Sequence, residues 1–288
     1  MIGADYSFEL DGWALMPGFL NAEERMSIRA NLASSLPARE ATCVRQPGND
    51  LLPLRWDDFI VAKILRSRTH LQQIRDACEA PDLRWLSGYI SAKAPESSAL
   101  WWHQDWWCWD HPISFGLAAP QVAVLCYLAD TDEKNGALRV LPGSHHASMP
   151  IHSELPESDS VGADGLPAHH PAMSDLPGQR TLSVRAGDAV VLDYRLLHGT
   201  HANDGSHRRD RILLSFMPDW AGLPSELKAH LVIHSAQPGV DDTRAVDDSG
   251  YAALLPTYAD TPASIDLNRH PPAIFRARSV NPATQLAS

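Results

Sequence analysis

Short apolar segments of strand length, separated by Gly and Pro turn signals, fill the middle of the chain. "LRWLSGYISAKAP" alternates apolar and polar residues, as a half-buried strand does. "PQVAVLCYLAD" is almost continuously apolar and predicts a strand buried on both faces. "GALRVLPGSH", "GDAVVLDYRLLHGT" and "RDRILLSFMPDW" predict further strands. This pattern favours a β-sandwich or a β-barrel.

The N-terminal part reads differently, as an apolar segment followed by two helical stretches. Residues 21–36 predict a helix, because Asn21 is a good N-cap and Glu24 completes a capping box. Residues 57–80 carry an apolar stripe at helical spacing. We therefore expect a helical N-terminal part at about residues 1–80.

Two regions lack regular periodicity. Residues 145–180 form a long insertion between strands that is rich in Pro, Ser, His and Asp. Such insertions are usually functional lids or disordered segments, and we predict a lid that orders when substrate binds. Residues 219–288 are also loop-rich, with a weak helical signal near "SELKAHLV". We predict one domain over residues 1–288, with a β core at about 82–218. The five histidines of the insertion are interpreted as solvated loop residues: His145, His146, His152, His169 and His170.

Composition narrows the choice of partners and compartment. Asp and Glu number 35 against 24 Lys and Arg, for a formal net charge of -11, which argues against nucleic acid or an anionic membrane as partner. No apolar run approaches the ~20 residues of a membrane span, and the N-terminus lacks the features of a signal peptide. The four cysteines form no C-x-x-C pair and are expected to be free thiols. We expect a cytoplasmic protein that acts on a small molecule; the sequence does not indicate its oligomeric state.

His103 and Asp105 lie in "ALWWHQDWWCWDHP", between tryptophans. On a strand, residues two apart point to the same face, so both side chains can reach one point. A second histidine would complete a two-histidine, one-carboxylate site, which suits non-haem Fe(II) oxygenases. A structural hydrogen-bonded pair or a zinc site are the alternatives.

The second histidine is expected in "LLHGTHANDGSHRRDRILLSF". His198 ends an apolar strand and is favoured over His201, because a strand end holds a ligand more rigidly than a turn does. Farther along, Arg209 and Arg211 share one face of the next strand. A buried guanidinium needs an acidic partner, and a small dicarboxylic cosubstrate beside the metal would supply one.

The order of these motifs resembles the phytanoyl-CoA hydroxylase family of Fe(II)- and 2-oxoglutarate-dependent dioxygenases. The matching stretches are "WHQD", "NGALRVLPGSH", "GDAVVLDYRLLHGTHAN" and "RRDRILLSF", and the opening "DGWALMPGFLNAEE" is also similar to the family. The resemblance covers about residues 8–218. It implies a mainly β fold with flanking helices, namely a double-stranded β-helix (a cupin-like jelly roll).

The resemblance also implies the roles of individual residues. It makes His103, Asp105 and His198 the ligands of Fe(II), with 2-oxoglutarate and O2 as cosubstrates. The family's 2-oxoglutarate arginine lies eleven residues after the distal histidine, which is Arg209 here, with Arg211 as the fallback. Thr200 matches a position that hydrogen-bonds the same carboxylate.

Lys93 is interpreted either as a surface lysine or as a cation that faces an anion near the site. The tryptophans have two interpretations as well. They fill the core, or Trp106, Trp107 and Trp109 form the wall of a substrate pocket beside Gln104.

The implied reaction is hydroxylation of a C–H bond in a small, partly apolar or aromatic molecule, such as a natural-product intermediate or an amino-acid derivative. Asp105 favours hydroxylation over halogenation, because related halogenases have a small residue there. Desaturation and cyclisation stay open. The alternatives are a cupin-type metal enzyme that does not use 2-oxoglutarate and a non-catalytic β-helix binding protein.

Overall fold

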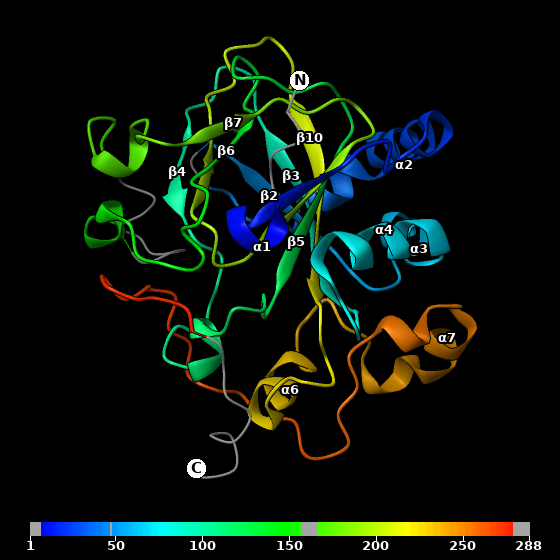
Figure 1. Cartoon of the computed structure of the whole chain (residues 1–288). Coiled ribbons are helices and arrows are strands. Elements are labelled where there is room, and N and C mark those ends of the chain that lie inside the picture. Colours follow the sequence, from blue (N-terminus) through cyan, green and yellow to red (C-terminus); the bar gives the residue numbers. More distant parts are fainter. Residues whose placement is uncertain (1–6, 47, 157–165, 279–288) are drawn as a thin grey trace.

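The computed structural model describes residues 7–46, 48–156 and 166–278, which fold mainly into antiparallel β-sheets with flanking helices (Figure 1). One sheet has six strands in the order β1-β8-β5-β10-β3-β2, and the other has four in the order β4-β9-β6-β7. The strands are β1 (Trp13–Met16), β2 (Asp50–Leu54), β3 (Arg84–Lys93), β4 (Leu100–His103), β5 (Val122–Tyr127), β6 (Leu138–Val140), β7 (Arg180–Leu182), β8 (Ala189–Asp193), β9 (His198–Thr200) and β10 (Arg209–Met217).

The helices lie mostly in the N-terminal part of the chain, with two more after β10. They are α1 (Phe8–Asp11), α2 (Ala22–Glu40), α3 (Phe59–Leu65), α4 (Arg68–Cys78), α6 (Ser225–Leu231) and α7 (Thr243–Asp248). Short 3₁₀ turns lie at Pro112–Phe115, Pro150–Ser153, Pro171–Met173, Val240–Asp242 and Ala252–Leu254.

The predicted capping box of α2 is confirmed. The Asn21 side chain accepts from the Glu24 amide, and the Glu24 carboxylate accepts from the Asn21 amide, each at 2.9 Å. The second predicted helical stretch is divided into α3 and α4. Its break falls at Ser67, which is extended and caps α4 through its hydroxyl. The N-terminal part also supplies β1 and β2, which form the two edges of the six-stranded sheet.

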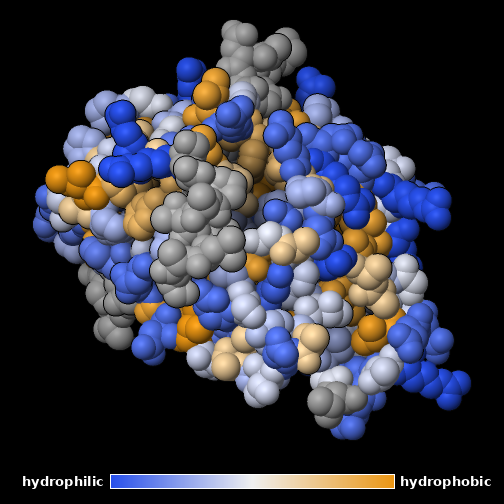
Figure 2. Space-filling view, turned by 60° about the horizontal axis from the view of Figure 1, so that its bottom comes forward, coloured by the Kyte–Doolittle hydropathy of each residue, from blue (hydrophilic) through white to orange (hydrophobic). Residues whose placement is uncertain are grey.

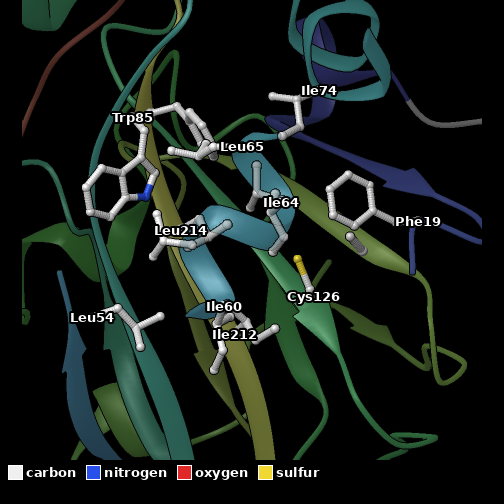
Figure 3. Packing of buried hydrophobic residues seen from close by; sticks show 14 of the residues in the cluster. Phe19, Leu54, Ile60, Ile64, Leu65, Ile74, Trp85, Cys126, Ile212 and Leu214 are labelled. Atoms are coloured by element: carbon white, nitrogen blue, oxygen red, sulfur yellow. The ribbon is translucent and has the colours of Figure 1, made fainter. Parts of the chain in front are cut away.

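Helices α2, α3 and α4 cover the outer face of the six-stranded sheet, and the largest apolar cluster lies between them. Figure 3 shows Ile60 and Ile64 of α3 against Ile212 and Leu214 of β10. Burial of these side chains contributes about 25 cal/mol per Å² of apolar area. The helices therefore fix which face of each strand is left to point into the space between the sheets.

Alternation along β10 decides what enters that space. Ile212 and Leu214 belong to the helix-side cluster, so Arg209, Arg211 and Leu213 point the other way, toward the four-stranded sheet. All six residues of β5 are buried, as predicted from its continuous apolar run.

The described part of residues 145–180 lies against the outer face of the four-stranded sheet, where Trp102 packs with Ile151 and Ala172. Two of its histidines are buried, so the solvated interpretation is wrong for them: His145 contacts the Glu9 carbonyl, and His152 contacts the Gln104 side chain, each at 3.1 Å. Residues 157–165 lie outside the described residues, and the lid stays a prediction.

The cysteines, the helices and the molecular surface can be compared with the expectations from the sequence. All four cysteines are free. Within the described residues, no helix combines the length and apolarity needed to cross a membrane. On the face seen in Figure 2, apolar residues occur in small groups among hydrophilic ones.

Candidate metal centre

Two imidazoles and one carboxylate converge between the sheets. His103 ends β4, His198 begins β9, and these two residues are paired in the sheet register. The Nε2 atoms of His103 and His198 each lie 3.6 Å from a different oxygen of Asp105. One ligand atom from each residue lies within 4.8 Å of the others. Atoms that share an ion through bonds of about 2.1 Å are roughly 3 to 4 Å apart, so the 3.6 Å separations suit a single ion.

Backbone carbonyls orient both imidazoles. The Nδ1 of His103 lies 2.8 Å from the Trp101 carbonyl, and the Nδ1 of His198 lies 2.9 Å from the Leu196 carbonyl. A carbonyl only accepts, so each Nδ1 carries the proton and donates it. Each Nε2 then presents a lone pair toward Asp105, which is the arrangement found in metal-binding histidines.

Burial keeps the inner imidazole neutral. Desolvation, with a further contribution from His103, lowers the pKa of His198 to about 4. A metal ligand must be deprotonated at the coordinating nitrogen, so His198 needs no proton loss before binding at neutral pH. Asp105 is held by its own backbone, because its amide and that of Trp106 both donate to the Tyr194 carbonyl at 3.0 Å.

His201 does not join this cluster. Its Nε2 contacts the Thr181 hydroxyl at 2.8 Å, on the far side of β9 from the cluster. The structure therefore brings together the three residues favoured from the sequence and leaves the competing histidine elsewhere.

A group of unpartnered polar atoms lies deeper between the sheets. Arg209 is 4% exposed, and none of its three guanidinium nitrogens has a hydrogen-bond partner among the described residues. The hydroxyls of Thr200 and Tyr127 are also buried without a partner there. Burial, with Arg211 next, lowers the pKa of Arg209 to about 9. A buried cation without a carboxylate is costly, so this region fits an anionic ligand with several acceptor oxygens.

A cavity of about 250 Å³ adjoins the metal-ligand cluster. Its apolar wall includes Leu100, Trp101, Trp107, Leu213, Leu231 and Leu267. Polar side chains on its surface include Ser87, Tyr89, Gln121, Tyr194, Arg211 and His230.

Three of the residues expected around the substrate do not reach this cavity. Trp106 is fully buried and donates through Nε1 to the Ser114 hydroxyl, and Trp109 packs against Phe275. Gln104 is buried and its amide donates to the Arg195 carbonyl. For Trp109 the expectation assumed that strand alternation continues past residue 105, and it fails because β4 ends at His103. Gln104 and Trp106 have the parity of the face opposite to His103 and Asp105, so alternation itself did not favour them.

Lys93 is buried, so its interpretation as a surface lysine is wrong. Its ammonium donates to the Gly48 and Ser98 carbonyls at 2.7 and 2.6 Å. Burial, followed by the nearby Arg209 and Arg211, lowers the pKa of Lys93 to about 7. Lys93 adjoins Arg209 in the register of β3 and β10 and does not line the cavity.

Sequence reasoning missed the contribution of the C-terminal region. His230 and Leu231 of α6, together with Leu267, line the cavity, and His230 contacts the ring of Trp107 with 5.3 Å between centroids. The weak helical signal near α6 marked a helix but not its location. Tyr127 was also missed, because in the sequence it belongs to an unbroken apolar strand.

The two imidazoles and the carboxylate between two antiparallel sheets match the donor set of mononuclear non-haem metalloenzymes. Residues 8–210 match the family described as phytanoyl-CoA dioxygenase (PhyH). The chain therefore belongs to the PhyH family, which confirms the resemblance inferred from the motifs.

Similar proteins agree with this assignment. L-proline trans-4-hydroxylase from Streptomyces griseoviridis is 22% identical over 75% of this chain and 86% of its own length. Ectoine dioxygenase from Nocardia farcinica is 24% identical over 73% of this chain and 75% of its own length. The crystal structure of HygX from Streptomyces hygroscopicus with nickel and 2-oxoglutarate bound has a TM-score of 0.55, is 24% identical and covers 73% of this chain and 84% of HygX. The last similarity supports the fold.

Proposed function

We propose that this chain is an Fe(II)- and 2-oxoglutarate-dependent oxygenase that hydroxylates a C–H bond of a small, partly apolar or aromatic molecule. The convergence of His103, Asp105 and His198, together with the unpartnered guanidinium of Arg209 on the inward face of β10, is the observation that carries the proposal. The proposal includes a jelly-roll fold in a single domain. The two antiparallel sheets and α6 support it, because residues of both sheets and of α6 line the same cavity.

His103, Asp105 and His198 hold the iron in this proposal. The Arg209 fork binds the far carboxylate of 2-oxoglutarate, assisted by the hydroxyls of Thr200 and Tyr127. When bound, Fe(II) and 2-oxoglutarate together use O2 to convert a C–H bond into an alcohol, with succinate and carbon dioxide as coproducts. The chain itself supplies orientation and a dry cavity.

Asp105 makes hydroxylation the default outcome, because a carboxylate at this position fills the site that halide needs. Trp101, Trp107 and Leu213 hold the substrate and exclude water from the reacting carbon. The named relatives act on proline and on ectoine, which are small molecules.

Succinate release tests this function. Purified protein is supplied with Fe(II), ascorbate, 2-oxoglutarate and air, and a panel of small molecules is screened for succinate and for a product with one added oxygen atom. We expect at least one coupled substrate and no turnover without iron.

Binding separates this function from the alternatives. A cupin-type enzyme or a binding protein that does not use 2-oxoglutarate leaves the buried Arg209 without an anion, so 2-oxoglutarate affinity is decisive. Calorimetry on nickel-loaded protein that detects no 2-oxoglutarate binding refutes the proposal.

A further inference from the structure

Two arginines, one pleat apart on β10, point into the space between the sheets. Arg209 pairs with Lys93 in the register, and Arg211 pairs with Ser91 on one side and Tyr127 on the other. Residues two apart on a strand are separated by roughly 7 Å, so one carboxylate group cannot occupy the ideal position on both guanidinium groups. Only Arg211 of this pair lines the cavity.

Ser91 fixes the orientation of Arg211. The Arg211 Nε donates to the Ser91 hydroxyl at 3.1 Å, and that hydroxyl donates to Asn49 Oδ1 at 2.8 Å. Arg211 is 4% exposed, and its NH1 has no hydrogen-bond partner among the described residues. Because Nε is occupied, the end of the guanidinium formed by its two terminal nitrogens stays available for a bidentate contact.

Charge balance in the loaded site leaves Arg211 uncompensated. The two charges of the metal and the charge of Arg209 are offset by Asp105 and by the two carboxylates of 2-oxoglutarate. The nearby Lys93 is outside this sum, because the Gly48 and Ser98 carbonyls accept from its ammonium and it does not line the cavity. Asp105 is also the sole acidic side chain among the described residues that line the cavity. A buried guanidinium without an anion is strongly disfavoured, so a further negative group is needed when the substrate binds.

Resting on the function proposed above, we infer that Arg211 is a specificity residue that binds a carboxylate or similar anionic group of the substrate. The apolar part of the same substrate lies along Leu213 and Trp107, toward Leu231 of α6. The enzyme thereby selects small acids over their neutral analogues.

The test uses matched pairs of ligands that differ only in charge. Calorimetry follows the titration of each acid and its primary amide into protein loaded with nickel and 2-oxoglutarate. The pairs include benzoate and benzamide, cyclohexanecarboxylate and its amide, and L-proline and L-prolinamide. We expect at least one acid to bind about 10- to 100-fold more tightly than its amide, as loss of a charge-assisted fork implies.

Arg211→Met is expected to abolish the preference for the acid while 2-oxoglutarate affinity stays within about threefold. Arg211→Lys keeps the positive charge but not the two-pronged guanidinium, so we expect it to retain part of the preference for the acid. This variant replaces Arg211→Met in the test if Arg211→Met does not fold. Arg209→Met is the matched control and is expected to weaken 2-oxoglutarate instead.

Two results overturn the inference: no acid in the panel binds more tightly than its amide, or Arg211→Met weakens 2-oxoglutarate as much as Arg209→Met does. Failure of the parent protein to bind 2-oxoglutarate at all is a different result, and it refutes the proposed function itself.

Discussion

Replacing Arg209 by methionine separates cosubstrate binding from folding. Its three guanidinium nitrogens have no partner among the described residues, so the substitution removes no hydrogen bond that the structure shows. A bound carboxylate loses two charge-assisted hydrogen bonds, each worth about 1.5 to 3 kcal/mol. Because the two share one carboxylate, we take the combined loss as about 3 to 4 kcal/mol, which is a 100- to 1,000-fold weaker affinity.

The assay is anaerobic calorimetry of 2-oxoglutarate into nickel-loaded protein, with thermal unfolding of the ligand-free protein in parallel. Burying a lone cation is unfavourable, so the melting temperature of ligand-free Arg209→Met is expected to equal or exceed that of the parent. Unchanged 2-oxoglutarate affinity refutes the reasoning, and so does a loss of affinity that only accompanies unfolding.

Three further predictions concern stability and the cavity wall. Gly136→Ala, which places a Cβ in steric overlap with Lys93 Cδ at a φ of +84°, lowers the free energy of unfolding in urea by about 2 kcal/mol or more. Trp106→Ala lowers it by about 3 to 5 kcal/mol, whereas Trp107→Ala mainly raises KM for the substrate. Burial lowers the pKa of His145 to about 4, below its unfolded value of 6.5. The unfolded state therefore binds more protons between these values, and stability falls by about 3 kcal/mol as pH drops through this window, less so in His145→Gln.

Each of these predictions has a contradicting outcome. A Gly136→Ala protein as stable as the parent shows that the turn before β6 has room for a side chain. Equal KM effects of Trp106→Ala and Trp107→Ala contradict the cavity wall described above. If the free energy of unfolding falls with pH equally in the parent and in His145→Gln, groups other than His145 cause the loss of stability.

The parts of the fold that were predictable depend on local rules. The N-cap of α2 needs only Asn21 and Glu24, and β5 needs only its apolar run. The expectation that His198 ends the apolar strand was wrong, because β8 ends at Asp193 and His198 begins β9, with Gly199 inside that short strand.

The wall of the cavity was not predictable in this way. Alternation places Trp109 beside Trp107 only if the strand continues, and β4 ends at His103. The chain then turns because the amides of residues 105 and 106 donate to the carbonyl of Tyr194, nearly 90 residues away. Such a long-range contact leaves no periodic signal in the sequence.

The position of α6 is a second long-range effect. Its sequence shows a short amphipathic helix, and the packing of its Leu227 with Trp220 and Trp107 places it at the cavity. Residues 211–278 lie beyond the family match, so neither the motifs nor the resemblance assigned His230 and Leu231 to the substrate side.

An anaerobic spectroscopic titration shows whether His198 is needed for an iron site that 2-oxoglutarate chelates. Fe(II) and then 2-oxoglutarate are added to the parent protein and to His198→Ala, and the visible charge-transfer absorption of an Fe(II)–2-oxo acid chelate is followed. We expect saturation at one iron per chain in the parent and no such absorption in the folded variant. An equal absorption in both proteins, or none in a parent protein that binds iron, contradicts this expectation.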